Sequence, residues 1–126
     1  MKPNRSQDKF DELVLRAIED LPEVFLDCLE NVAIVVEEWP DRAVLQSVGV
    51  RQRSHLLGLY QGIPQTDRTH GYNLVMPDKI SIYRRPILMR CRTDSEVHEL
   101  VQRVVRHEIA HHFGIDDDRL TEIGAY

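Results

Sequence analysis

Three observations predict an α+β fold for this chain. Apolar residues recur at helical spacing in two stretches, one near the N-terminus and one after Arg92. Between them lie short runs of β-branched, aromatic and other apolar residues that are bounded by turn-forming residues, as is typical of strands. No internal repeat, low-complexity segment or linker divides the 126 residues, so we expect a single domain over residues 1–126.

The first predicted element is an amphipathic helix from Asp8 to Asp20. Ser6 or Asp8 is suited to cap its start. Pro22 is expected to end it or to begin a second short helical turn over Glu23–Leu29. The apolar positions follow the spacing that gives a helix one apolar face, and they are Phe10, Leu13, Val14, Ala17, Ile18 and Leu21.

Strands are predicted in the middle of the chain. They are Asn31–Glu38, Leu56–Tyr60 and Lys79–Tyr83. The residues that bound these runs are Trp39, Pro40, Gly62, Pro64, Pro77 and Asp78. Pro86 lacks an amide hydrogen, which limits how far the third run extends as a central strand. The pattern over Asp41–Ser54 is poorly determined, with a helix favoured in its first half.

A long helix is predicted from Thr93 to Phe113. Thr93 and Glu96 fit a capping box, which satisfies free amides at a helix start. Gly114 is a natural end, because the residue after a helix often adopts the left-handed conformation that glycine tolerates. Asp116–Ile123 is suited to a short final helix. The apolar residues on one broad side are Val97, Leu100, Val101, Val104, Val105 and Ile109.

Composition argues against several classes of protein. The chain is 42% hydrophobic and 29% charged, as in ordinary soluble globular proteins. No apolar run approaches the ~20 residues that a membrane span needs, and the first ten residues lack the apolar region of a signal peptide. Cys28 and Cys91 are too few and too far apart for a disulfide framework, so we expect reduced thiols and a cytoplasmic location.

Charge is unevenly distributed along the chain. Residues 42–106 carry 11 basic and 5 acidic side chains, whereas residues 1–41 carry 4 basic and 11 acidic, and residues 107–126 carry 1 and 5. A basic middle would suit an anionic partner such as nucleic acid. We favour the interpretation that its arginines pair with the acidic ends, and we do not expect nucleic acid as a partner.

The long helix contains the sequence His107-Glu108-Ile109-Ala110-His111. Histidines at i and i+4 lie on one helix face, so both imidazoles can reach one zinc ion. Glu108 is rotated by about 100° from His107. This position suits a general base that reaches a water at the ion, rather than a further ligand.

The motif extends to HExxHxxGxxD. A glycine that ends the helix, Gly114, turns the chain back, so that Asp117 approaches the ion from another direction. The sequence therefore predicts one zinc ion bound by His107, His111 and Asp117, with the fourth position open to water as in catalytic sites.

Weaker candidates surround these residues. Glu122 is a rival third ligand that ranks below Asp117. His112 is expected to face the apolar side, where it packs or supports a ligand, and Asp116 and Asp118 are suited to cap the last helix. Histidines without metal-like spacing are His55, His70 and His98.

The sequence HEIAHHFGIDDDRL resembles the signature of a small bacterial zincin-like metallopeptidase family, formerly described as a domain of unknown function. The resemblance is strongest over Thr93–Leu120 and looser over the strands and the opening helix. It implies a minimal zincin fold, in which a short mixed or antiparallel sheet of about three strands packs against the histidine-bearing helix. It also implies zinc ligands at His107, His111 and Asp117 and a base at Glu108. Wider relatives have a histidine in the place of Asp117.

The expected function is zinc-dependent hydrolysis of peptide bonds in a peptide or protein substrate, with Glu108 as general base. An edge strand, either Leu56–Tyr60 or Lys79–Tyr83, is expected to hold the substrate by strand addition. Two alternatives stay open: a metal-dependent endoribonuclease, and a zinc-binding interaction module with little or no turnover. Candidates for stabilising the oxyanion, by residue type alone, are Tyr60, Tyr72, Tyr83 and Tyr126.

Overall fold

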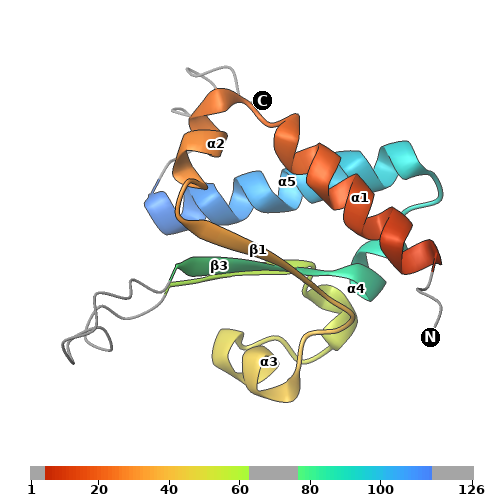
Figure 1. Cartoon of the computed structure of the whole chain (residues 1–126). Helices are drawn as coiled ribbons and strands as arrows, with labels where there is room; N and C mark the ends of the chain where they lie inside the picture. The colour runs from red at the N-terminus through yellow and green to blue at the C-terminus, as the bar shows by residue number, and fades with distance from the viewer. Residues whose placement is uncertain (1–4, 63–76, 115–126) are drawn as a thin grey trace.

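A computed structural model describes residues 5–62 and 77–114 and confirms the α+β class (Figure 1). Over these residues the elements, in chain order, are α1 (Arg5–Glu19), α2 (Glu23–Cys28), β1 (Val32–Glu37), α3 (Arg42–Val48), the 3-10 turn η1 (Arg53–His55), β2 (Gly58–Gln61), β3 (Asp78–Tyr83), α4 (Arg84–Leu88) and α5 (Asp94–Phe113).

Helix α1 follows the predicted apolar spacing, and its buried side chains include Phe10, Val14 and Ala17. The described helix already includes Arg5, so Ser6 and Asp8 lie within it rather than at its N-cap, and the predicted caps are wrong. Pro22 is the N-cap residue of α2, and its carbonyl accepts a hydrogen bond from the Phe25 amide at 2.9 Å. Proline suits this position because the first amides of a helix have no partner within it.

The three strands form one mixed sheet in the order β1-β3-β2. Strand β3 pairs in parallel with β1 and antiparallel with β2, so that Ile80 lies between Ile34 and Tyr60. The central position of β3 rules out Lys79–Tyr83 as the edge strand. Pro86 lies beyond it in the first turn of α4, where a missing amide hydrogen costs no helical hydrogen bond.

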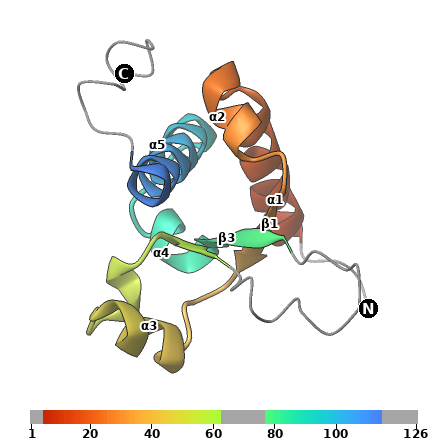
Figure 2. The ribbon, with the colours of Figure 1, turned by 90° about the vertical axis from the view of Figure 1, so that its left-hand side faces the viewer.

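Helices α1, α2 and α5 cover one face of this sheet, and α3 lies on the other side (Figures 1 and 2). The core lies between the sheet and the first group of helices. Its members include Phe10, Val14, Ala17, Ile80, Ile82, Val101, Val105 and Ile109. No helix in the described ranges is long and apolar enough to cross a membrane.

Helix α3 confirms the helix favoured in the first half of Asp41–Ser54. The carboxylate of Asp41 accepts a hydrogen bond from the Val44 amide at 2.8 Å, which caps the helix start. Gly49 ends the helix with φ of 72°. The Arg53 guanidinium then lies 4.0 Å from the centroid of the Trp39 ring, a cation–π contact that connects η1 to the chain segment after β1.

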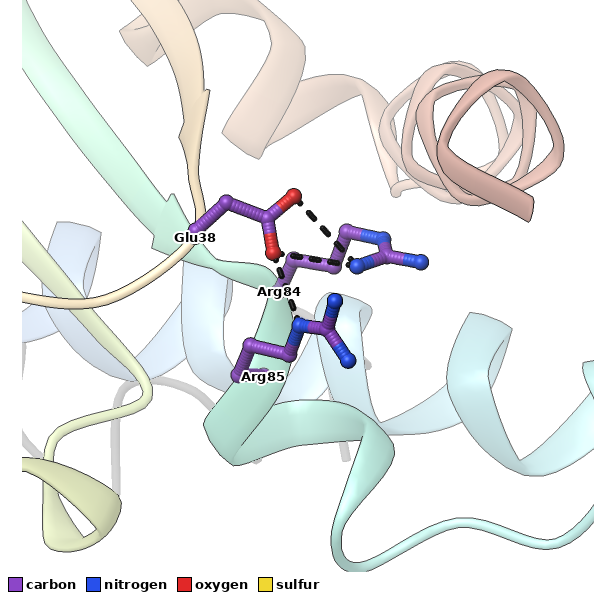
Figure 3. Close-up of polar contacts among 3 residues, drawn as sticks. All are labelled: Glu38, Arg84 and Arg85. Carbon is purple, nitrogen blue, oxygen red and sulfur yellow. Dashed lines mark hydrogen bonds and ion pairs between the residues drawn. The ribbon is translucent and has the colours of Figure 1, made fainter. Parts of the chain in front are cut away.

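An ion-pair cluster connects β1 to α4 at the far end of the sheet from the C-terminus of α5 (Figure 3). The side chain of Arg84 is only 3% exposed, and its Nη1 lies 3.0 Å from Oε2 of Glu38. Nε of Arg85 donates to the same oxygen at 2.9 Å. Two arginines from the basic middle thus pair with an acid of the N-terminal segment, in agreement with the favoured interpretation of the charge distribution.

Candidate active site

Helix α5 is built as its sequence predicts. The hydroxyl of Thr93 accepts a hydrogen bond from the Glu96 amide at 3.1 Å, and the Glu96 carboxylate accepts one from the Arg92 amide at 3.2 Å. At the other end Gly114 has φ of 69° and donates its amide hydrogen to the Ala110 carbonyl. The left-handed conformation of Gly114 thus ends α5 directly after the histidine motif.

The two predicted histidine ligands lie on one exposed face of α5. The ring centroids of His107 and His111 are 6.4 Å apart, and the ring planes differ by only 13°. Both residues are exposed, while Val105 and Ile109 on the opposite side of the helix are fully buried. Burial of this apolar stripe therefore orients both imidazoles outward.

Helix α5 and strand β2 run side by side in the same direction. Gly58 lies against Val104, Tyr60 against Glu108, and Gly62 beside His112. Two strand residues advance by about 6.7 Å and four helix residues by about 6.0 Å, so the two elements stay in step over these three contacts.

Gly58 permits the close approach of the helix. A Cβ atom at this position would lie 2.6 Å from Cγ1 of Val104 and 3.0 Å from the carbonyl oxygen of Ser81. Both distances are shorter than normal van der Waals contact. The absence of a side chain at Gly58 is therefore what allows α5 to pack directly on β2.

Glu108 contacts the backbone of β2. The amide of Tyr60 donates a hydrogen bond to Oε1 of Glu108 at 2.9 Å. On the other side of β2, the amide of Tyr83 donates to the carbonyl of Leu57 at 2.9 Å. Since hydrogen-bonded and non-hydrogen-bonded pairs alternate in an antiparallel ladder, Gly58 and Tyr60 direct their amides and carbonyls away from β3. The carboxylate of Glu108 thus lies at the free edge of the described sheet.

The side chain of Tyr60 makes two further contacts. Its hydroxyl donates to Oδ2 of Asp78 at 2.8 Å, and its ring stacks on His112 with centroids 3.8 Å apart and planes 19° apart. The Phe113 ring meets the Tyr60 ring edge-on at 6.1 Å. Burial, then the hydrogen bond and charge of Asp78, raise the pKa of Tyr60 to about 12, so the phenol stays protonated at neutral pH.

The structure also describes His112, three residues of the other predicted sets, and their surroundings. His112 is exposed rather than on the apolar side, although it does pack, through its ring, on Tyr60. His98 pairs with Asp20 at 2.7 Å, and His55 lies in η1. Tyr83 is buried on the face of the sheet opposite α5, because side chains alternate along a strand and Ile82 faces the helices.

The third predicted zinc ligand, Asp117, lies outside the described residues. The same holds for the rival ligand Glu122 and for the proposed final helix Asp116–Ile123. Other predicted residues outside the described ranges are Asp118, His70, Tyr72 and Tyr126. Within residues 5–62 and 77–114, no group of three histidine, cysteine or acidic side chains is close enough to hold a metal ion. The described part of the site consists of the imidazoles of His107 and His111 and the carboxylate of Glu108. Imidazole is the commonest metal ligand in proteins.

Comparison with known proteins shows the family. Residues 29–125 match the family model of the zincin-like metallopeptidases. The chain belongs to this family. Membership supports a zinc-dependent hydrolase and the minimal zincin fold. The matched range begins after α2, so the opening helix α1 lies outside it. No curated protein matches the chain.

Sequence reasoning missed the backbone donor of this zincin-like site. Every residue except proline carries an amide hydrogen, so the residue type at Tyr60 gave no sign that its backbone would meet Glu108. One signal was present in the sequence: Gly58 interrupts the run Leu56–Tyr60. A glycine inside a strand often marks a place where another element comes close.

Proposed function

We propose that this chain is a zinc-dependent metallopeptidase, with His107, His111 and Asp117 as the ligands of one zinc ion and Glu108 as general base. The observation that carries the proposal is the position of Glu108. Glu108 directly follows His107, the first histidine of the predicted ligand pair. Its carboxylate also lies at the free edge of strand β2 in the described sheet. A general base next to a strand edge is suited to act on a peptide backbone.

The donors fit zinc by their chemistry. Two imidazoles one helical turn apart, with a carboxylate predicted beyond a glycine turn, form a set of two nitrogen ligands and one oxygen ligand. Zinc bound there would lower the pKa of a water to roughly 7 and polarise the carbonyl of the scissile bond. The exposure of both histidines leaves the face of α5 that carries them accessible to a substrate.

Strand β2 is the surface that would hold the substrate. Gly58 directs its amide and carbonyl outward, as Tyr60 does with its carbonyl, and an extended peptide would pair with these groups by strand addition. The Tyr60 amide already donates to Glu108. We therefore expect the scissile bond to lie opposite Tyr60, where the carboxylate of Glu108 is within reach of both the water and the leaving nitrogen.

Glu108 would act twice in the reaction. It first accepts a proton from the attacking water, and it then donates that proton to the nitrogen of the leaving amine as the carbon–nitrogen bond breaks. The carboxylate ends the cycle in its starting, ionised form. Neither the phenol of Tyr60, which donates to Asp78, nor the buried Tyr83 is assigned a part in these proton transfers.

Cleavage of a peptide library by the zinc-loaded protein tests this proposal. We expect cleavage that a chelator abolishes and that added zinc restores. Stoichiometric zinc without cleavage of any peptide would instead support a zinc-binding interaction module. Binding of RNA with an affinity that falls steeply with salt, together with RNA cleavage, would support an endoribonuclease.

A further inference from the structure

We propose that Tyr60 is the positioning residue of this site. In this proposal its backbone holds the carboxylate of Glu108, and its side chain holds the last turn of α5 against the sheet. The assignment rests on the proposed function, in which Glu108 is the general base. It adds a residue that acts through Glu108 and does not itself react.

The Tyr60 amide restricts the motion of the Glu108 carboxylate. A glutamate side chain has several rotatable bonds, and ordering it costs free energy before any reaction begins. The Tyr60 amide holds Oε1 of Glu108 at 2.9 Å. The other oxygen, Oε2, is then left to receive a proton from water. Because the donor is a backbone group in a paired strand, its position is fixed by the sheet rather than by a flexible side chain.

The Tyr60 side chain contacts the C-terminal end of α5. The Tyr60 hydroxyl is anchored to Asp78, the first residue of β3, at 2.8 Å. Its ring is stacked on His112, the neighbour of the predicted ligand His111. One side chain thus connects two strands to the last turn of α5. A shift of this turn would move the imidazole of His111 relative to the Glu108 carboxylate, which the Tyr60 amide holds one turn earlier.

The place of Tyr60 in the sheet suits it to this role. In the antiparallel ladder its amide faces away from β3, whereas the amide of Leu59 faces toward it. Its side chain lies on the same sheet face as the buried Ile80, which is the face covered by α5. Gly58, two residues earlier, has the same orientation and lets the helix come close enough for the contact.

The first test measures amide hydrogen exchange in metal-free, ¹⁵N-labelled protein, so that it does not depend on activity. We expect the Tyr60 amide to exchange about tenfold faster in Glu108→Ala than in the wild type, because a charged acceptor has been removed. Glu108→Gln keeps an acceptor oxygen and should retain protection. The Leu59 amide, which faces β3, should be unchanged in both variants and reports opening of the strand.

The second test separates kcat from KM. Tyr60→Ala keeps the amide but loses the stack and the anchor, and we expect kcat to fall by about tenfold or more with KM and zinc content little changed. Tyr60→Phe keeps the ring and should restore most of kcat. Glu99→Gln, which changes an exposed residue earlier on α5, is the control, with kcat expected to remain at the wild-type value.

The two tests distinguish the inference from the proposed function. Equal Tyr60 exchange rates in wild-type protein and Glu108→Ala would overturn the positioning role, as would an unchanged kcat in Tyr60→Ala. Faster exchange of the Tyr60 amide in Glu108→Ala would support the hydrogen bond between Tyr60 and Glu108 even if the wild-type protein cleaves no peptide. In that case only the proposed function would fail.

Discussion

The backbone amide of Tyr60 and the carboxylate of Glu108 are joined by a hydrogen bond of 2.9 Å between strand β2 and helix α5. The bond connects the predicted general base to the strand edge that would carry the substrate. Its formation depends on the close packing of α5 on β2, and this packing depends in turn on a residue two positions before Tyr60.

That residue is Gly58, and we expect Gly58→Ala to destabilise the fold. The new methyl group would overlap Val104 and the Ser81 carbonyl, and overpacking of this kind costs about 1–3 kcal/mol. Urea unfolding measures the loss, and faster exchange of the Tyr60 amide should accompany it. Gly62→Ala is the control. Its added Cβ would lie 3.6 Å from Cε1 of His112, which is an ordinary van der Waals distance. Equal stability of the two variants would contradict this account of the packing.

Gly114 offers a second prediction, with Gly49 as a matched control. Both glycines end a helix with positive φ, 69° and 72°, and among the described residues neither has an atom within 4 Å of an added Cβ. Each change to alanine should therefore cost about 1 kcal/mol, from backbone strain alone. Only Gly114→Ala should also weaken zinc binding, because it alters the turn before Asp117. A zinc affinity equally reduced in Gly49→Ala would argue against a specific role for this turn.

The cluster at Glu38 predicts a dependence of stability on pH. Burial alone would raise the pKa of Glu38, but the hydrogen bonds and charges of Arg85 and Arg84 outweigh it and hold the pKa below the usual 4.5. The resulting stabilisation is present above pH 4.5 and is lost as the pH falls through the lowered pKa.

Unfolding of Glu38→Gln at several pH values tests whether the charge of Glu38 stabilises the fold. Since the side chain of Glu38 is 43% exposed, we expect a loss of only about 1 kcal/mol at pH 7. The difference from the wild type should shrink below pH 4. Glu12→Gln, which removes an exposed i,i+4 pair with Arg16, should have little effect. A deficit of Glu38→Gln that stays constant down to pH 3 would show that the charge of Glu38 is not its source.

The third zinc ligand is tested by metal analysis of purified variants. Asp117→Ala should lose stoichiometric zinc, because two imidazoles alone hold the ion weakly. Glu122→Ala, which removes the rival acid, should keep it. The opposite pattern would transfer the role to Glu122.

The sequence predicted best those features that depend on local pattern. Thr93, the apolar stripe and Gly114 together set the limits of α5, because caps and periodicity act within a few residues. The described part of α1 includes Arg5, three residues before the predicted start at Asp8.

Features that depend on distant parts of the chain were less accessible. The order β1-β3-β2 follows from pairing between strands far apart in sequence. The local patterns of Leu56–Tyr60 and Lys79–Tyr83 therefore favour neither of them as the edge strand. The hydrogen bond between Tyr60 and Glu108 joins residues 48 positions apart through a backbone group. Residue type carries no information about such a donor.

Cleavage by Glu108→Gln tests the central claim most directly. The variant should bind zinc in the same stoichiometry as the wild type but cleave the best substrate of the library at least about 10²-fold more slowly, because the general base is lost. Glu99→Gln, an exposed glutamate earlier on α5, should match the wild type in both measurements. Undiminished, chelator-sensitive cleavage by zinc-loaded Glu108→Gln would contradict the assignment of Glu108 as the base.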